Sequence, residues 1–327
     1  MDAFTPAQTI ELISRIGTKK ATMRLDKLII NSIMGGLLLG FGCALNVSTA
    51  SAPWFQTNAP GLIRTIAACF FPVGLIMVFL TGADLFTSYC MYSIVALLHR
   101  RITVLHLLKT WVISFLCNLA GILFFGIVLV GYGGVFSSGA FKTEAIAFAV
   151  GKVITPAWHQ VFLRGILANW LVTMAVFLSI SSREVASKII SIWFPTMCFT
   201  ALGVDHVIAN MFYIPVGIFS GAPISVGFYI WKSMIPAGLG NIVGGGLFVG
   251  VVYWYLYLAG SEVTVPFDTT PAQNAVLVPS GPINQGHTPA STLHDGDSIN
   301  RVGGIESELH GSLFKKGHSF KNSQETV

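Results

Sequence analysis

Six apolar stretches, each long enough to cross a lipid bilayer, constrain this chain more than any other feature of its sequence. A transmembrane helix needs about 20 apolar residues. Only 10% of the 327 residues are charged and 53% are hydrophobic, whereas soluble domains carry about 25% charged residues. The sequence therefore predicts an all-α membrane protein with six transmembrane helices. We expect them near residues 28–50, 64–98, 105–131, 158–181, 187–219 and 231–258.

The chain divides into three predicted parts. Residues 1–26 form a cytoplasmic N-terminal segment, in which apolar side chains over residues 6–18 recur at helical spacing. This spacing favours an amphipathic helix that lies on the membrane surface and contacts lipid. Residues 27–258 form the six-helix transmembrane domain. Residues 259–327 are rich in Pro, Gly, Ser, Thr, Asn and Asp, so we expect a disordered cytoplasmic tail.

Basic residues gather before the first span, after the second, and between the fourth and fifth. By the positive-inside rule both termini are predicted to be cytoplasmic. Residues 1–26 lack the uninterrupted apolar core of a cleaved signal peptide, so we expect the first span to act as the insertion signal. Together with the long polar tail, this favours a eukaryotic plasma-membrane protein. The residues that set the orientation are Lys19, Lys20, Arg24, Lys27, Arg100, Arg101, Arg183 and Lys188.

Similar strings interrupt the second and fifth spans, Gly82-Ala83-Asp84 in one and Gly203-Val204-Asp205 in the other, about 121 residues apart. The third and sixth spans carry a second matching pair, Asn118 and Asn241. Because each half holds three spans, an odd number, the two halves would cross the membrane in opposite directions. The sequence thus predicts an inverted 3+3 repeat with helices 2 and 5 broken.

A break in a membrane helix is tolerated only where it lines a polar path or is buried in protein, since every backbone group must be hydrogen-bonded. Gly82 and Gly203 would allow the turn, and Asp84 and Asp205 are expected to cap the half-helices that follow. The positive ends of those half-helices would favour an anion at the centre. Direct contact of the two carboxylates with the transported ion is the alternative to capping.

His206 is the one histidine of eight that lies deep in an apolar span. Ionisable groups at such depth are costly and tend to be functional. An imidazole changes charge near neutral pH, so it can attract an anion or exchange a proton with it. Apolar side chains near the two breaks are candidate constrictions, with ordinary packing as the alternative: Phe71, Leu75, Leu85, Phe86 and Phe199.

Three segments of the chain resemble the formate/nitrite transporter family. They are Thr81–Ser88 (TGADLFTS), similar to the first family signature; Gly165–Val172 (GILANWLV), similar to the second; and Asp205–Phe212 (DHVIANMF), similar to the block around the central histidine. Thr173 stands where the family usually has Cys, and Asp205 where it more often has Glu.

The resemblance implies an aquaporin-like six-helix protomer, assembled as a homopentamer with one anion pathway per protomer. No NPA string occurs, which argues against an aquaporin itself. It further implies that His206 is the central proton-exchanging residue and that Thr87 is its hydrogen-bond partner. Asn169 would be a polar residue of the pathway, and Lys152 would draw anions into the outer vestibule. It also implies that two apolar slits are formed by Phe71, Leu75, Leu85 and Phe199, with Phe86 supporting the loop.

The predicted function is transport of a small monovalent anion, nitrite or formate, by proton symport. Burial against Phe71 and Leu75 is expected to raise the proton affinity of the anion. The anion would take a proton, from His206 or from water, and cross as a neutral acid. The alternative is a passive channel for formate, acetate, lactate or hydrosulfide.

Other classes of protein fit the sequence less well. A membrane enzyme would require a paired acid and base, a metal cluster or an activated nucleophile, and a receptor gives no reason for two symmetric breaks. We predict no metal site and no cofactor, because the five cysteines lack metal-ligand spacing. Basic residues lie at membrane edges rather than on one face, so no nucleic-acid partner is expected.

Overall fold

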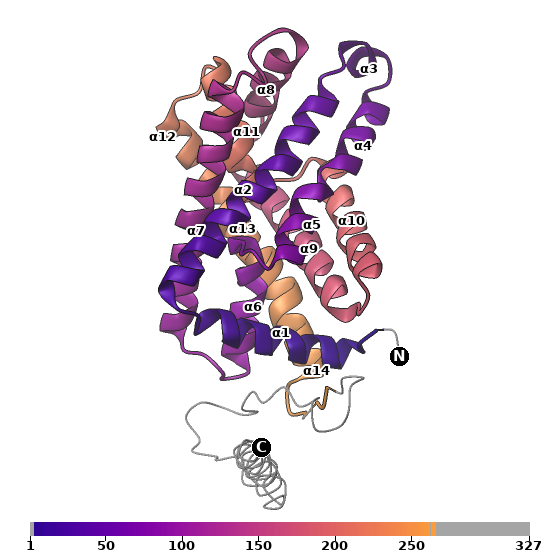
Figure 1. The fold of residues 1–327 in the computed structure, drawn as a ribbon, viewed down its shortest axis with the longest axis vertical. Helices are drawn as coiled ribbons and strands as arrows, with labels where there is room; N and C mark the ends of the chain where they lie inside the picture. The colour runs from indigo at the N-terminus through magenta and orange to yellow at the C-terminus, as the bar shows by residue number, and fades with distance from the viewer. Residues whose placement is uncertain (1–2, 262, 266–327) are drawn as a thin grey trace, which may run out of the picture. The chain divides into compact units, whose positions relative to one another are not determined.

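A computed structural model describes residues 3–261 and 263–265 of the chain (Figure 1). The regular elements of these residues are all helices, apart from one isolated bridge between Ala3 and Ser182. The predicted disorder of the tail concerns residues 266–327, which lie outside the described residues.

Six helical segments are long and apolar enough to cross a membrane, which confirms the predicted all-α fold with six spans. Their limits differ from the predicted ones mainly in the second and fifth spans, each of which ends at its break. In order they are α2 (Leu25–Ala50); α4 (Pro60–Phe70) with α5 (Pro72–Thr81); α7 (Val104–Leu123) with η1 (Phe124–Tyr132); α9 (Trp158–Ser181); α10 (Val185–Leu202); and α12 (Val226–Tyr229), η2 (Ile230–Met234), α13 (Ile235–Val243), η3 (Gly244–Val251) and α14 (Val252–Tyr257).

Two connections between spans also contain helices, which the sequence analysis missed. At one end of the helical domain lie α3 (Pro53–Asn58) and α8 (Gly139–Val153), and at the opposite end lies α1 (Pro6–Ala21) (Figure 1). The π-helical segments η1, η2 and η3 were missed as well, because apolar periodicity does not distinguish a π-helix from an α-helix.

The chain leaves helical geometry at both glycine-containing strings. The helix α5 ends at Thr81 and α6 (Phe86–Leu98) follows, while α10 ends at Leu202 and α11 (Val207–Ser220) follows. Gly82 and Gly203 adopt left-handed backbone angles, with φ of 79° and 70°. Only glycine takes these angles without a steric penalty, so it ends each preceding helix at a defined residue.

Asparagines from neighbouring spans cap the two half-helices. The N–H group of Phe86 donates to Asn118 Oδ1 at 2.8 Å, and the N–H group of Val207 donates to Asn241 Oδ1 at 2.8 Å. Each amide nitrogen then ties a break to a neighbouring helix. Asn118 Nδ2 donates to the carbonyls of Ser32 in α2 and of Asp84, at 2.6 and 2.8 Å. Asn241 makes the matching bonds to a carbonyl of α9 and one of the second break, at 2.8 and 3.0 Å.

The expectation that Asp84 and Asp205 cap these half-helices is therefore wrong. Asp84 Oδ1 accepts from Lys20 Nζ, and Asp205 Oδ1 accepts from Lys152 Nζ at 3.0 Å. A carboxylate buried in protein needs an opposite charge, whereas a neutral amide satisfies backbone groups without one. The matched bonds of the two halves agree with the predicted inverted repeat, which stays a prediction.

The N-terminal helix α1 packs on protein rather than on lipid. A capping box between Thr5 and Gln8 begins it, and Ile10 and Ile13 are fully buried in a cluster with residues of α6 and α9. The expected contact of these two side chains with lipid is wrong, because α6 and α9 cover the apolar face of α1.

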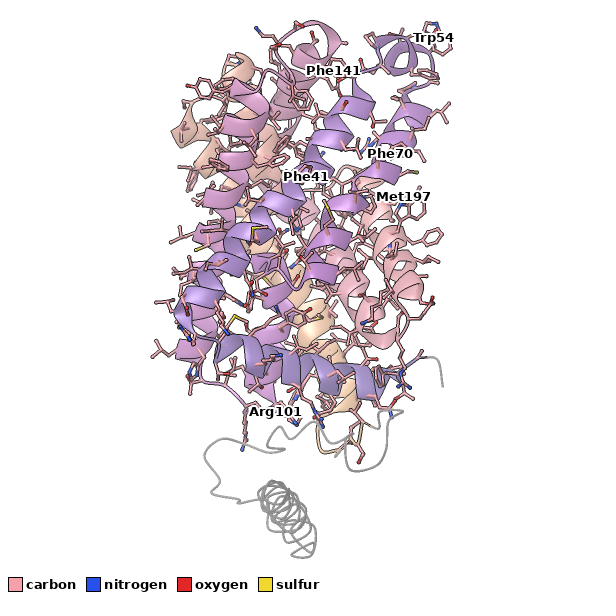
Figure 2. The ribbon with its side chains drawn as sticks, in the orientation of Figure 1. Phe41, Trp54, Phe70, Arg101, Phe141 and Met197 are labelled. Carbon is pink, nitrogen blue, oxygen red and sulfur yellow. The ribbon has the colours of Figure 1, made fainter. Side chains whose placement is uncertain are left out.

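The outer faces of the spans are apolar. Figure 2 shows Phe41 on α2 and Phe70 on α4 projecting from the bundle, and their side chains are 51% and 45% exposed. Large apolar side chains exposed over the length of a helix are costly in water and favourable in hydrocarbon. The described helices are thus built for a bilayer.

Replacing Asn118 with Leu is expected to destabilise the fold. The change leaves the N–H group of Phe86 and two carbonyl groups without their partner, and each buried unsatisfied group costs about 1–3 kcal/mol. The thermal midpoint of the purified protein in detergent should fall by roughly 5 °C or more. Asn58→Leu is the control, since Asn58 Nδ2 bonds only the carbonyl of Trp54 at the end of α3. Equal thermal midpoints for the two variants would contradict the role of Asn118 in holding the first break.

Candidate functional site

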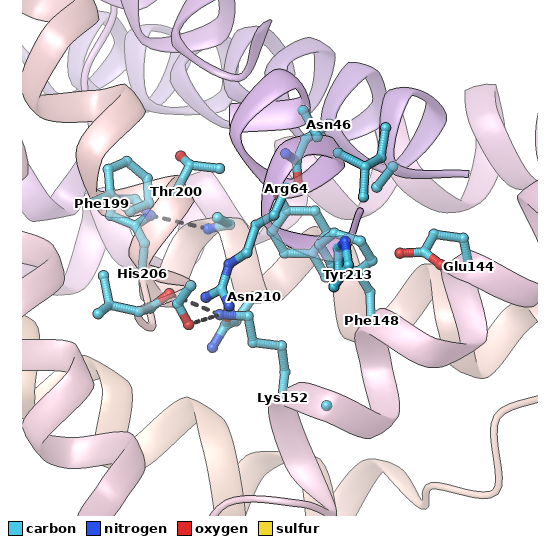
Figure 3. A pocket seen from close by; sticks show the side chains of 18 of the residues that line it. Asn46, Arg64, Glu144, Phe148, Lys152, Phe199, Thr200, His206, Asn210 and Tyr213 are labelled. Carbon is cyan, nitrogen blue, oxygen red and sulfur yellow. Dashed lines mark hydrogen bonds between the residues drawn. The ribbon is translucent and has the colours of Figure 1, made fainter. Parts of the chain in front are cut away.

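Two cavities open toward opposite ends of the helical domain, and each reaches one of the breaks. The first has a volume of about 350 Å³, lies at the end that carries α3 and α8, and reaches Gly203 and His206 (Figure 3). The second has a volume of about 400 Å³, lies at the α1 end, and reaches Gly82 and Asp84. The region between the two breaks is therefore the barrier between the cavities.

His206 lies at this barrier and is only 2% exposed. The residue is the N-cap of α11, and its Nδ1 accepts the N–H group of Ala209 at 3.1 Å. Its Nε2 lies 3.0 Å from Thr87 Oγ1, in the first turn of α6. The structure thus joins the two half-helices through one side-chain hydrogen bond.

The hydrogen bonds of His206 define its protonation state in this geometry. A ring nitrogen that accepts an N–H group carries no proton of its own, so the proton of the ring lies on Nε2. Nε2 then donates to Thr87 Oγ1. A doubly protonated imidazolium would lose the bond to Ala209. The arrangement therefore holds a neutral imidazole that presents a donor toward Thr87.

Aromatic rings close the first cavity above His206. The rings of Phe71 and Phe199 meet edge to face with centroids 5.1 Å apart, and the centroid of Phe199 lies 5.9 Å from that of His206. Phe71 and Leu75 are each only 1% exposed. These side chains offer a passing ion no polar group, so they form an apolar constriction beside the histidine at the inner end of the cavity.

Leu85 and Phe86, which follow the first break, lie in two different places. Leu85 lines the second cavity, next to Asp84. The ring of Phe86 instead packs against Trp111 and Phe115, with centroids 6.2 and 5.2 Å apart. Phe86 lies on the wall of a separate apolar groove, where it can position the first break without facing either cavity.

Asn169 lies beside the barrier and bonds both halves of the protein. Its Nδ2 donates to the carbonyl of Thr87 at 3.0 Å and to the carbonyl of Asn241 at 2.7 Å. The residue is fully buried and belongs to the wall of neither cavity. In this geometry its amide ties the first turn of α6 to α13.

Lys152 lies in the first cavity, but its ammonium group is already occupied. Nζ donates to the carbonyls of Gly203 and Val204 at 3.1 and 2.8 Å, and pairs with Asp205 Oδ1 at 3.0 Å. These three acceptors match the three hydrogens of an ammonium group. Lys20 holds the corresponding carboxylate, Asp84, at the second cavity.

The structure places further polar residues in the first cavity that the sequence analysis did not select. Arg64 and Glu144 line it together with Gln56, whose Nε2 donates to Glu144 Oε2 at 2.6 Å. Burial raises the pKa of the Glu144 carboxyl above its ordinary value, and the Gln56 hydrogen bond opposes that shift. Arg64 was considered only as the boundary of an apolar span, and Glu144 lies in a helix that the apolar pattern did not indicate.

Comparison with known proteins agrees with this architecture. The family described as Formate/nitrite transporter matches residues 7–255. The "Probable formate transporter" of Methanothermobacter thermautotrophicus is 36% identical over 268 residues, which are 78% of this chain and 97% of that protein.

Two solved structures share the fold. One, titled "Pentameric formate channel with formate bound", has a TM-score of 0.62 and 26% identity, and the match covers 71% of this chain and 97% of that chain. The other, titled "FNT family ion channel", has a TM-score of 0.68 and 23% identity over 76% of this chain and 98% of that one. The chain belongs to the formate/nitrite transporter family, a family of transporters and channels rather than enzymes.

Proposed function

We propose that this protein carries a small monovalent anion, formate or nitrite, across a membrane together with a proton. The observation that carries the proposal is the buried, neutral His206 between the two breaks, at the inner end of the first cavity and beside the paired rings of Phe71 and Phe199. The relative and the solved structure named for formate support formate as a passenger.

The apolar constriction favours a neutral passenger. An isolated anion loses its hydration between Phe71 and Phe199, and this loss costs several kcal/mol. The same desolvation raises the proton affinity of the anion. Since formate and nitrite are conjugate bases of weak acids, they can avoid this cost by taking a proton and crossing as the acid.

The hydrogen bonds of His206 favour the solution as the source of that proton. A neutral imidazole would become an imidazolate if it gave up its Nε2 proton, and a water molecule would become hydroxide, so the proton comes from the solution as hydronium, relayed to the anion through water in the cavity. The imidazole instead offers its Nε2–H, beside the Thr87 hydroxyl, as a hydrogen-bond donor to the passenger. His206 therefore donates a hydrogen bond to the carboxylic or nitrous acid as it crosses the barrier between the two breaks.

Passive passage of the charged anion is the second candidate, favoured by the printed title of the solved formate channel. A channel of that kind would need a positive charge at the barrier. In residues 3–261 the lysines at the breaks, Lys20 and Lys152, are each paired with an aspartate, and Arg64 lies against Gly203 in the first cavity rather than between the two breaks. We therefore rank the symporter first.

We further propose a homopentamer in the plasma membrane, with the α1 end and both termini in the cytoplasm. The pentameric title of the structural relative and the basic residues near α1 support this arrangement. Lipid is then expected to cover the apolar outer faces that the subunits leave free.

His206→Asn is expected to slow proton-driven accumulation while leaving the fold intact. Asparagine is a good N-cap and can still accept the N–H group of Ala209, but its shorter amide falls short of Thr87. Losing a neutral hydrogen bond worth about 0.5–1.5 kcal/mol predicts uptake that is slower by about twofold to tenfold. The measurement is uptake of labelled formate and nitrite into proteoliposomes under an imposed proton gradient. His159→Asn, at the exposed start of α9, is the control, and undiminished accumulation by His206→Asn would refute the central role of the histidine.

Phe199→Ala is expected to uncouple anion from proton. Removal of one ring opens the constriction to water, so the charged form no longer has to shed its hydration. Anion flux through this variant should generate a membrane potential, detected with a voltage-sensitive dye. Phe194→Ala, on the same helix but 60% exposed, should behave as the unaltered protein. Electrically silent transport by Phe199→Ala would argue against the constriction.

Glu144→Gln is expected to make anion affinity less dependent on pH. The raised pKa means that Glu144 keeps its proton at higher pH than an exposed glutamate, and it adds a negative charge to the cavity of Arg64 and Lys152 only above that pKa. The ratio of the KM of the unaltered protein to that of the variant should be near 1 at low pH and rise about twofold to fivefold as pH increases through the raised pKa. A ratio independent of pH would show that Glu144 leaves the approaching anion unaffected.

A further inference from the structure

The two cationic side chains that line the first cavity, Lys152 and Arg64, differ in how many of their N–H groups are hydrogen-bonded. Lys152 directs its three N–H groups at two carbonyls and at Asp205, so it has no donor left for a ligand. Its charge is balanced by that of Asp205. An anion that enters this cavity therefore finds no free N–H group and no net charge at the Lys152–Asp205 pair.

Arg64 differs from Lys152 in this respect. It extends from α4 into the same cavity, and among residues 3–261 and 263–265 its guanidinium makes no ion pair or hydrogen bond. Figure 3 shows the side chain reaching toward the residues around the second break. A methyl group placed on Gly203 would overlap the guanidinium, so Arg64 lies directly against this turn.

The position of Arg64 puts it at the entrance to the constriction. The N–H group of Gly203 bonds the carbonyl of Phe199 at 3.1 Å, so Arg64 lies one helical turn from the ring that narrows the path. Phe199, Thr200 and His206 line the same cavity. An anion held by Arg64 would wait beside the aromatic barrier.

We propose that Arg64 is an anion-docking residue of the first cavity, selective for planar monoanions that present two oxygens, such as formate and nitrite. A guanidinium offers parallel N–H groups that match two oxygens of one ligand, whereas chloride and hydrosulfide meet only a point charge. The cavity of about 350 Å³ accommodates such a three-atom anion with water around it. The inference rests on the proposed function, since it names how that passenger is selected.

The test compares Arg64→Gln, which removes the charge, with Arg64→Lys, which keeps the charge but not the planar fork. Labelled formate uptake is measured in cells that express each variant at equal membrane abundance, with chloride as competitor. The KM for formate should rise about fivefold or more in Arg64→Gln, with Vmax changed less than twofold, because docking precedes the barrier. In Arg64→Lys, preference for formate over chloride should fall several-fold.

Lys142→Gln is the matched control. Lys142 is an exposed cation of α8 at the same end of the molecule, but it does not line the cavity. A KM rise of equal size in Lys142→Gln and Arg64→Gln would overturn the proposal, because it would show general electrostatic attraction. An unchanged KM in Arg64→Gln would overturn it as well.

Direct binding separates this inference from the proposed function. Saturation-transfer NMR of formate on the purified protein should give a signal that Arg64→Gln removes and Lys142→Gln keeps. If the unaltered protein carries no anion but shows this Arg64-dependent signal, the proposed function fails and the docking site stands. If it transports formate and the signal survives Arg64→Gln, the docking site fails and the proposed function stands.

Discussion

The structure depends on the rule that backbone N–H and C=O groups in hydrocarbon must find hydrogen-bond partners. Two broken helices would violate this rule at the centre of the protein. Asn118 and Asn241 satisfy it, since each caps one half-helix and binds carbonyl groups on two chain segments. Asn169, in α9, donates to the carbonyl of Thr87 in α6 and to the carbonyl of Asn241 itself. The uncharged amides allow non-helical backbone where an ion path is to pass.

The asparagine caps also determine the protonation state of His206. Because Asn241 fixes the start of α11, His206 occupies the N-cap and its Nδ1 is used by Ala209. The ring is held neutral with its donor toward Thr87. The aspartates of the breaks are neutralised by lysines, so the barrier carries little net charge. A barrier of this kind favours a neutral acid over an anion.

The sequence predicted the six-span fold better than it predicted the contacts around His206. Apolar length is local information, so all six spans were found, although the predicted second and fifth spans ran past the breaks at which the helices end. Gly82 and Gly203 were correctly expected to bend the chain because left-handed angles are a property of glycine itself.

Contacts between segments that are distant in the sequence were harder to predict. Nothing local shows that Asn118 rather than Asp84 caps α6, because the choice depends on where Lys20 of α1 lies. The role of Lys152 as the anion-attracting charge was implied by the family resemblance, whereas its three hydrogen-bond partners became visible only in the fold. Arg64 and Glu144 were missed because they belong to one cavity only through tertiary structure.

Voltage clamp of the reconstituted protein with a pH indicator on the far side tests the central claim most directly. With a formate or nitrite gradient and no pH gradient, the account predicts no current and one proton delivered with each anion. A current that reverses at the equilibrium potential of the anion, with no accompanying change in pH, would contradict it.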